Sequence, residues 1–255
     1  MAFTVFILQL AVRILSFPLY LLKFLGLWNQ ISKKWFPYYM MKFSQTAGLC
    51  GPSGKLSLLE VGSGTGTNFK FYPPGCRVTC VDPNPNFEKF LFKSIPENRH
   101  LQFERFLVAA GENMHQMADS SVNVVVCTTV LCSVENQEQM LREVCRVLRP
   151  GGAFFFIEHV ADKHSTWNYF WQQVVEPAWY LVFDGCNLTR EKSWKALERP
   201  SFSKLKLQHI QPLLSCKVLH PHVYGYAVKY PTATTDFPQA SHNPQPLHLP
   251  QSSCS

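Results

Sequence analysis

The stretch Leu58-Leu59-Glu60-Val61-Gly62-Ser63-Gly64-Thr65-Gly66 decides the fold of this chain. A short apolar run ends in an acid and then breaks into alternating glycines. A buried parallel strand that turns sharply into a helix has this pattern, because glycine adopts left-handed backbone and lets a ligand approach the main chain. The stretch therefore predicts a strand and a ligand-binding loop, and several nucleotide-like ligands fit it at this stage.

The segments after this loop alternate between strand-like and helix-like patterns. Apolar runs predict strands over residues 55–61, 76–81, 102–107, 122–127, 153–157, 205–210 and 223–229. Helices are expected from the loop to about residue 71, over 85–94, from Asn136 to Pro150-Gly151-Gly152, and over 167–183. Asn136 with Gln139 resembles a capping box. The alternation predicts an α/β fold: a doubly wound, mostly parallel seven-stranded Rossmann-like sheet with helices on both faces.

The first residues of the chain are strongly apolar. No basic residue precedes the apolar run 3–27 and no small-residue cleavage site follows it, so it does not read as a signal peptide. As a helix this run would be roughly 37 Å long, enough to span a bilayer with tilt. However, its polar members would form one stripe, which suits a helix lying in the membrane interface; these are Gln9, Arg13, Ser16, Tyr20 and Lys23. Interfacial anchoring and a single span both remain open.

Composition divides the chain into three parts. Residues 1–43 hold five basic side chains and no acid, so most of the net charge of +7 lies in the most hydrophobic part. This favours a membrane surface over nucleic acid as partner and places the main domain on the cytosolic side. We expect a membrane anchor over 1–43, an α/β domain over 44–230, and a disordered tail over 231–255, which is rich in Pro, Ser, Thr, Gln and His.

The nine cysteines are scattered and form no CxxC pair. Paired CxxC spacings are the usual sign of a structural zinc site. The sequence therefore predicts reduced thiols in a cytosolic environment and no bound metal.

Three residues narrow the choice of ligand. A dinucleotide-binding loop needs G-x-G-x-x-G, but Thr67 stands where the third glycine should be. The carboxylate of Glu60 would repel a pyrophosphate and attract an ammonium or sulfonium group. Asp82 follows Gly62 by 20 residues, at the end of the second strand, where a carboxylate can accept both ribose hydroxyls. These features disfavour a nicotinamide-dependent reductase and favour a cationic nucleoside ligand.

Three motifs, taken in their order along the chain, resemble those of a known enzyme family. The loop 60–66, Asp82 and Leu148-Arg149-Pro150-Gly151-Gly152 resemble class I S-adenosylmethionine-dependent methyltransferases. The apolar amino terminus and the segments 69–76, 82–87 and 183–186 resemble the methyltransferase-like seven subfamily more closely. The resemblance covers residues 1–43 and 51–229. Members of that subfamily are alkyl thiol S-methyltransferases of the endoplasmic reticulum and lipid droplets.

This resemblance implies S-adenosyl-L-methionine as cofactor and a small lipophilic thiol as methyl acceptor. It also implies an endoplasmic reticulum membrane or lipid-droplet surface as partner, with the methyltransferase domain facing the cytosol. The residues it assigns to cofactor binding are Glu60, Gly62, Ser63, Gly64, Thr65, Gly66, Asp82, Pro83, Asn84, Gly111, Glu112, Cys127 and Thr128.

A base and an acceptor pocket are further candidates. His159 follows the strand 153–157, on the edge where α/β sheets bind ligands, and is the candidate catalytic base. The alternative is a histidine satisfied by local hydrogen bonds. An aromatic set lines either an acceptor pocket or the core face of a helix; its members are Trp167, Tyr169, Phe170, Trp171, Trp179 and Phe183.

The sequence leaves a second function possible besides an enzyme. The segment 44–50 is shorter than the helical stretch that covers the cofactor in the resembling family. A catalytically impaired, membrane-anchored adaptor with a methyltransferase fold is therefore the alternative to an enzyme.

Overall fold

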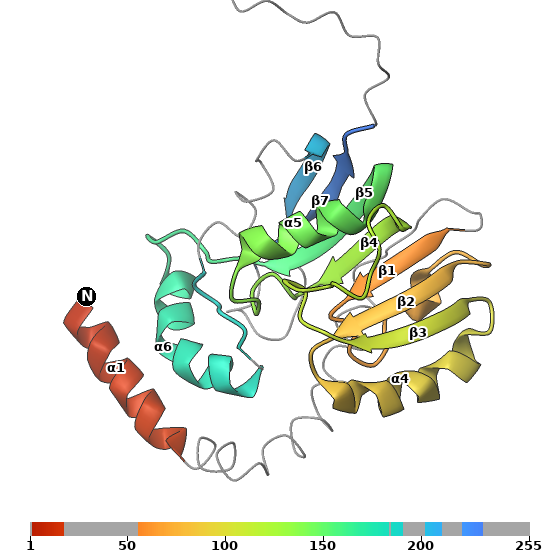
Figure 1. Ribbon diagram of the computed structural model, residues 1–255. Coiled ribbons are helices and arrows are strands. Elements are labelled where there is room, and N and C mark those ends of the chain that lie inside the picture. The colour runs from red at the N-terminus through yellow and green to blue at the C-terminus, as the bar shows by residue number, and fades with distance from the viewer. Residues whose placement is uncertain (1, 18–55, 184, 191–201, 211–220, 232–255) are drawn as a thin grey trace, which may run out of the picture.

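A seven-stranded sheet carries the body of the chain in the computed structural model, which describes residues 2–17, 56–183, 185–190, 202–210 and 221–231 (Figure 1). Its strands are β1 (Ser57–Val61), β2 (Arg77–Asp82), β3 (Gln102–Val108), β4 (Val122–Thr128), β5 (Leu148–His159), β6 (Phe202–Ile210) and β7 (His222–Lys229). The order is β3-β2-β1-β4-β5-β7-β6. The first five strands pair in parallel, and β7 pairs antiparallel with both β5 and β6. The predicted doubly wound, mostly parallel sheet is confirmed.

Four helices are described, and the first of them is separated from the sheet by the last (Figure 1). They are α1 (Ala2–Leu15), α4 (Glu88–Ser94), α5 (Gln137–Val147) and α6 (Trp167–Val182), with short 3-10 turns at Phe69–Phe71, Pro85–Phe87 and Ile95–Asn98. The predicted cap of α5 is confirmed, because the side chain of Asn136 accepts a hydrogen bond from the backbone N of Gln139 at 3.0 Å. The side chain of Thr166 caps α6 in the same way.

Alternation along β1 creates two hydrophobic cores. Successive side chains of a strand point to opposite faces of the sheet. Leu59 and Val61 enter a core that α5 covers, whereas Leu58 enters a second core that holds Leu91 of α4. All five residues of β1 are buried, as expected for a central parallel strand. Glu60 therefore lies on the α4 side, inside the protein rather than on its surface.

Two predicted boundaries are wrong. The helix expected from the glycine loop to residue 71 is only the 3-10 turn Phe69–Phe71. Left-handed glycines run up to Gly66, and Pro73 follows the turn closely, so too few residues remain for an α-helix. Likewise, Pro150-Gly151-Gly152 does not precede the fifth strand but lies within β5, which begins at Leu148 paired with Val122.

The amino-terminal helix α1 lies beside α6 (Figure 1). The side chain of Gln9 donates to the backbone O of Gln173 at 3.0 Å, and Ser16 is buried. The start of the predicted polar stripe thus faces the protein, while Arg13 is exposed. Within the described ranges, no helix has the length and apolar character that crossing a bilayer requires. The rest of the predicted anchor, the segment 44–50 and all but the first residue of the predicted tail lie outside the described residues.

The core on the α5 side predicts a large penalty for truncation. Phe154→Ala removes a fully buried ring that contacts Phe156 and Phe202. We expect the free energy of unfolding to fall by about 3–5 kcal/mol. Phe92→Ala on α4, where the ring is 49% exposed, is the matched control, with a loss of about 1 kcal/mol. Urea denaturation followed by circular dichroism measures both values, and equal losses would contradict the assigned core.

Candidate active site

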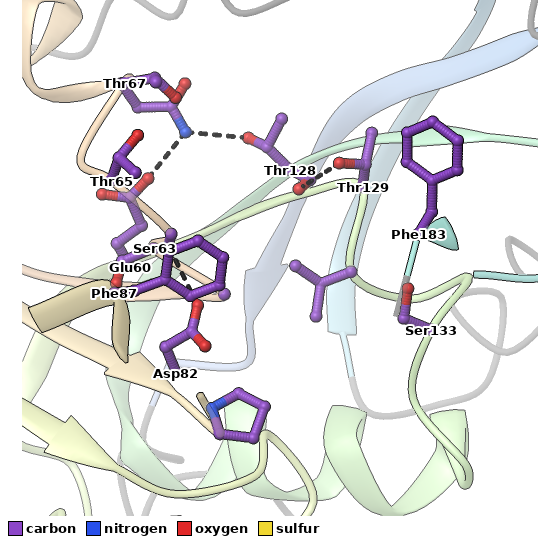
Figure 2. Close-up of a pocket in the computed structure, with 15 residues that line it drawn as sticks. Glu60, Ser63, Thr65, Thr67, Asp82, Phe87, Thr128, Thr129, Ser133 and Phe183 are labelled. Carbon is purple, nitrogen blue, oxygen red and sulfur yellow. Dashed lines mark hydrogen bonds between the residues drawn. The ribbon is translucent and has the colours of Figure 1, made fainter. Parts of the chain in front are cut away.

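A pocket lies at the carboxyl ends of β1, β2 and β4, and its empty space, including the part that is open solvent, is about 730 Å³ (Figure 2). Strand β1 has β2 on one side and β4 on the other, so the chain reverses its direction of winding here. Ligands of open α/β sheets bind at such a switch point. The pocket is lined by Glu60, Gly62, Ser63, Gly64, Thr65, Thr67, Asn68, Asp82, Pro83, Phe87, Thr128, Thr129, Val130, Ser133 and Phe183.

The glycine loop forms one wall, and its glycines have different roles. Gly62 and Gly64 have φ values of 69° and 51°, in the left-handed region. A Cβ on Gly62 would overlap the side chain of Val130. A Cβ on Gly64 would meet no protein atom within 4 Å, although Gly64 lines the pocket. The space in front of Gly64 is therefore open to a ligand, and Gly66 instead packs the loop against Phe69.

Asp82 holds this loop in place from the end of β2. Its Oδ2 accepts a hydrogen bond from the backbone N of Gly64 at 3.0 Å, and its Oδ1 accepts one from the backbone N of Asn84 at 2.9 Å. The carboxylate is therefore fixed beside the pocket floor. In doubly wound α/β sheets, an acidic residue at the end of the second strand accepts hydrogen bonds from the hydroxyls of a bound ribose.

Glu60 brings a buried carboxyl group to the same pocket. Asn68 Nδ2 donates to Glu60 Oε1 at 2.7 Å and to Thr128 Oγ1 at 3.1 Å. Burial raises the pKa of Glu60 to about 8, although the hydrogen bond from Asn68 acts in the opposite direction. Glu60 Oε2 and Ser63 Oγ make no hydrogen bond of good geometry with another described residue, although Tyr72 interacts with the Glu60 carboxyl group and acts to lower its pKa. Buried acceptors without partners are costly, so this pocket fits a ligand that brings positively charged donors.

These features match the chemistry of S-adenosylmethionine. The ammonium group of its methionine part supplies N–H donors for unpaired acceptors, and its ribose supplies hydroxyls for Asp82. The open space before Gly64 lets such a ligand lie against the main chain. The residues present therefore fit the predicted cofactor.

The structure brings eight of the predicted cofactor residues together in the pocket: Glu60, Gly62, Ser63, Gly64, Thr65, Asp82, Pro83 and Thr128. Gly66 and Asn84 are not part of its lining; Gly66 packs against Phe69, and the backbone N of Asn84 donates to Asp82. Glu112 does not line the pocket but accepts hydrogen bonds from the backbone N of Glu135 and Asn136, next to Gly111. Cys127 is buried and its Sγ donates to Glu158 Oε1 at 3.3 Å. For all thirteen residues, cofactor binding stays a prediction.

His159 does not line the pocket. It is buried at the end of β5, where its Nε2 lies 2.7 Å from Cys186 Sγ. Burial would lower the pKa of His159, but the neighbouring Cys132 raises it to about 9. A histidine satisfied by local contacts, the alternative to a catalytic base, agrees with this placement.

Several lining residues were missed by the sequence patterns, among them Thr67, Asn68, Phe87, Thr129, Val130 and Ser133. The sequence did not identify Asn68 because the segment from the glycine loop to residue 71 was expected to be a helix. The residue spacing gives no sign that the Asn68 side chain reaches back to Glu60. Of the aromatic set, Phe183 does line the pocket, with Trp179 stacked on it at 3.8 Å between centroids. Trp167, in contrast, is 77% exposed.

Comparison with known proteins gives consistent matches. Residues 59–156 match the family model described as a methyltransferase domain. The human thiol S-methyltransferase TMT1A is 72% identical over 245 residues, which is 90% of this chain and 100% of that protein. The human thiol S-methyltransferase TMT1B is 54% identical over 239 residues, 88% of this chain and 98% of that protein.

Solved structures show the same fold at low identity. A methyltransferase structure from Bacillus halodurans superposes with a TM-score of 0.54 at 17% identity, covering 74% of this chain and 98% of that one. A geranyl diphosphate methyltransferase, solved in complex with S-adenosylmethionine, gives a TM-score of 0.54 at 13% identity. The superposition covers 75% of this chain and 84% of that one. The predicted methyltransferase fold is confirmed.

The buried Glu60 predicts a pH-dependent affinity for S-adenosylmethionine. Below about pH 8 its carboxyl group is protonated in the ligand-free protein, and a bound cation favours the ionised form. Binding then releases a proton, so the Kd should fall as pH rises from 6 to 8, by up to about tenfold per pH unit, and level off above. Isothermal titration across this range measures the slope. Glu60→Gln should bind more weakly with a flatter profile, and an unchanged slope in this variant would contradict the assignment.

Proposed function

Because this chain belongs to the thiol S-methyltransferase family of TMT1A and TMT1B, we propose that it transfers a methyl group from S-adenosylmethionine to small alkyl thiols. The observation that carries the proposal is the buried carboxyl group of Glu60 in a pocket that Gly64 and the fixed Asp82 also line. The acceptor class rests on the similarity to relatives that are named thiol S-methyltransferases.

The chain's own residues bind and orient the reactants. S-adenosylmethionine supplies a methyl group bound to a positively charged sulfur, which is reactive toward a thiolate. Glu60, held by Asn68, provides negative charge for the methionine ammonium, and Asp82 accepts the ribose hydroxyls. Phe183 closes the pocket on the side away from Asp82 and offers an apolar surface for a lipophilic acceptor (Figure 2). Alignment and exclusion of water are then the main sources of rate enhancement.

The proposed reaction does not require a strong base. A free thiol has a pKa of about 8.5, so part of it is already thiolate at neutral pH. The acidic groups that line the pocket are Glu60 and Asp82, and both serve the cofactor in this account. His159 is absent from the lining, so we assign it no proton transfer.

Two glycine variants test the proposal. Gly64→Ala and Gly75→Ala both place a Cβ on a left-handed residue, and neither Cβ would meet a protein atom within 4 Å. Both should lose about 1 kcal/mol of stability from backbone strain. Gly64→Ala should weaken S-adenosylmethionine binding by more than about tenfold and reduce thiol methylation in parallel, because the new methyl group occupies ligand space.

Gly75→Ala is the matched control and should keep wild-type binding. Isothermal titration and a methylation assay with an alkyl thiol give the two readouts. Folded wild-type protein that binds no S-adenosylmethionine would overturn the proposal and favour the membrane-anchored adaptor instead.

We further propose that the domain rests on a membrane surface through the outer face of α1. Gln9 and Ser16 point toward the protein, which leaves a mostly apolar face outward. The exposed apolar residues of this face are Phe3, Phe6, Ile7, Leu10, Ile14 and Leu15, with Trp167 and Trp171 exposed on the adjoining α6. An exposed apolar face of this extent is typical of a membrane-binding helix. Its site of action would be the cytosolic surface of the endoplasmic reticulum and lipid droplets.

Vesicle flotation tests the membrane proposal. The double variant Phe6→Ser/Ile14→Ser removes two exposed apolar side chains from the outer face of α1. It should lower affinity for phosphatidylcholine vesicles by about 100-fold or more, since each side chain contributes about 1.5–3 kcal/mol when buried. Phe92→Ser, at an exposed site on α4, should float like the wild type. Equal flotation of all three proteins would contradict the proposed surface.

A further inference from the structure

Three buried side chains with metal-ligand chemistry meet next to the pocket. Cys132 lies in the loop after β4, His159 at the end of β5, and Cys186 in the segment after α6. Cys132 Sγ is 3.4 Å from Cys186 Sγ, and His159 Nε2 is 2.7 Å from Cys186 Sγ. All three ligand atoms lie within 4.8 Å of one another, and all three residues are buried. The cluster is distinct from the residues that line the cofactor pocket.

The separations suit a tetrahedral ion of the size of zinc. Zinc binds thiolates at about 2.3 Å and imidazole nitrogen at about 2.0–2.1 Å, which at tetrahedral angles places two sulfurs about 3.8 Å apart and a sulfur and a nitrogen about 3.6 Å apart. The observed distances are 3.4 Å and 2.7 Å. Side-chain movements of about 1 Å or less would admit the ion between them.

The surroundings also favour a bound cation. Phe183 and the two cysteines form one hydrophobic cluster, against which Trp179 and Val182 pack, so water does not solvate the thiols. Trp179 Nε1 donates to Cys186 Sγ at 3.3 Å, and Ser133 Oγ lies 3.6 Å from Cys132 Sγ. Donors to the sulfurs orient thiolate ligands and stabilise their negative charge.

We propose that Cys132, His159 and Cys186 form a zinc-binding site. Two thiolates and an imidazole are a ligand set typical of zinc, and binding releases the thiol protons to solvent. Three protein ligands leave the fourth position for water or an added thiol. The site joins three separate segments behind the pocket wall, since Ser133 and Phe183 are neighbours of the ligands and line the pocket. The proposal does not depend on the reaction that the pocket supports.

Metal analysis of the full chain tests this site. The protein, expressed with added zinc and purified with reductant and without chelators, should hold about one zinc per chain by mass spectrometry of the metal. Cys132→Ser and Cys186→Ser should each lower this content at least fivefold. Cys145→Ser is the matched control, because this thiol is only partly buried, lies on α5 outside the cluster and should leave the zinc content unchanged.

Cobalt substitution gives a readout that needs no variant. The wild-type chain loaded with Co²⁺ should show thiolate-to-cobalt charge-transfer absorption and the strong visible bands of a tetrahedral site, and added zinc should abolish both. A wild-type chain that retains no zinc and gives no such bands would overturn the proposal. So would unchanged zinc content in both cysteine variants, or a Cys132–Cys186 disulfide in the purified protein, because its sulfurs would not be thiolate ligands.

Discussion

The carboxyl group of Glu60 is the constraint on which the site depends. It lies in β1, the middle one of the five parallel strands, whose five residues are all buried. An isolated carboxylate in such a place is strongly disfavoured, so its pKa rises and it needs partners. Asn68 supplies one hydrogen bond and simultaneously fixes Thr128 of β4. The remaining oxygen makes no hydrogen bond of good geometry with a described residue, and in our proposal the cationic cofactor brings a donor to the pocket that Glu60 lines.

The sheet explains why that ligand can approach. Strands β2 and β4 flank β1, so Asp82 and Thr128 lie at neighbouring strand ends. Gly62 has left-handed backbone and no Cβ, so the loop can lie close to the side chain of Val130. No protein atom lies within 4 Å of where a Cβ of Gly64 would be. Asp82 then fixes Gly64 through its backbone N. The two acids thus differ in their contacts: Asp82 fixes the glycine loop, and in our proposal Glu60 faces the positive charge of the cofactor.

The sequence predicts the parts of this site that depend on local pattern. The strand ranges and the positions of Glu60, Gly64 and Asp82 follow from apolar runs, glycine spacing and acids at strand ends. It does not predict Asn68 or Ser133, because their places depend on how loops fold back across the sheet. The cluster of Cys132, His159 and Cys186 cannot be predicted from the sequence either. Cys186 is 27 positions from His159 and 54 from Cys132, so only the tertiary fold brings the three side chains together. The absence of a bound metal was predicted from cysteine spacing alone. The proposed zinc site is the opposite prediction, and the metal analysis decides between the two.

The central claim is methyl transfer to sulfur, and product analysis tests it most directly. The full chain would be incubated with S-adenosylmethionine labelled in its methyl group, together with an alkyl thiol or the alcohol of the same chain length. Our account predicts a labelled S-methyl thioether from the thiol and no labelled product from the alcohol, because a thiol ionises near neutral pH and an alcohol does not. Labelled ether from the alcohol, or no labelled thioether from protein that binds the cofactor, would contradict it.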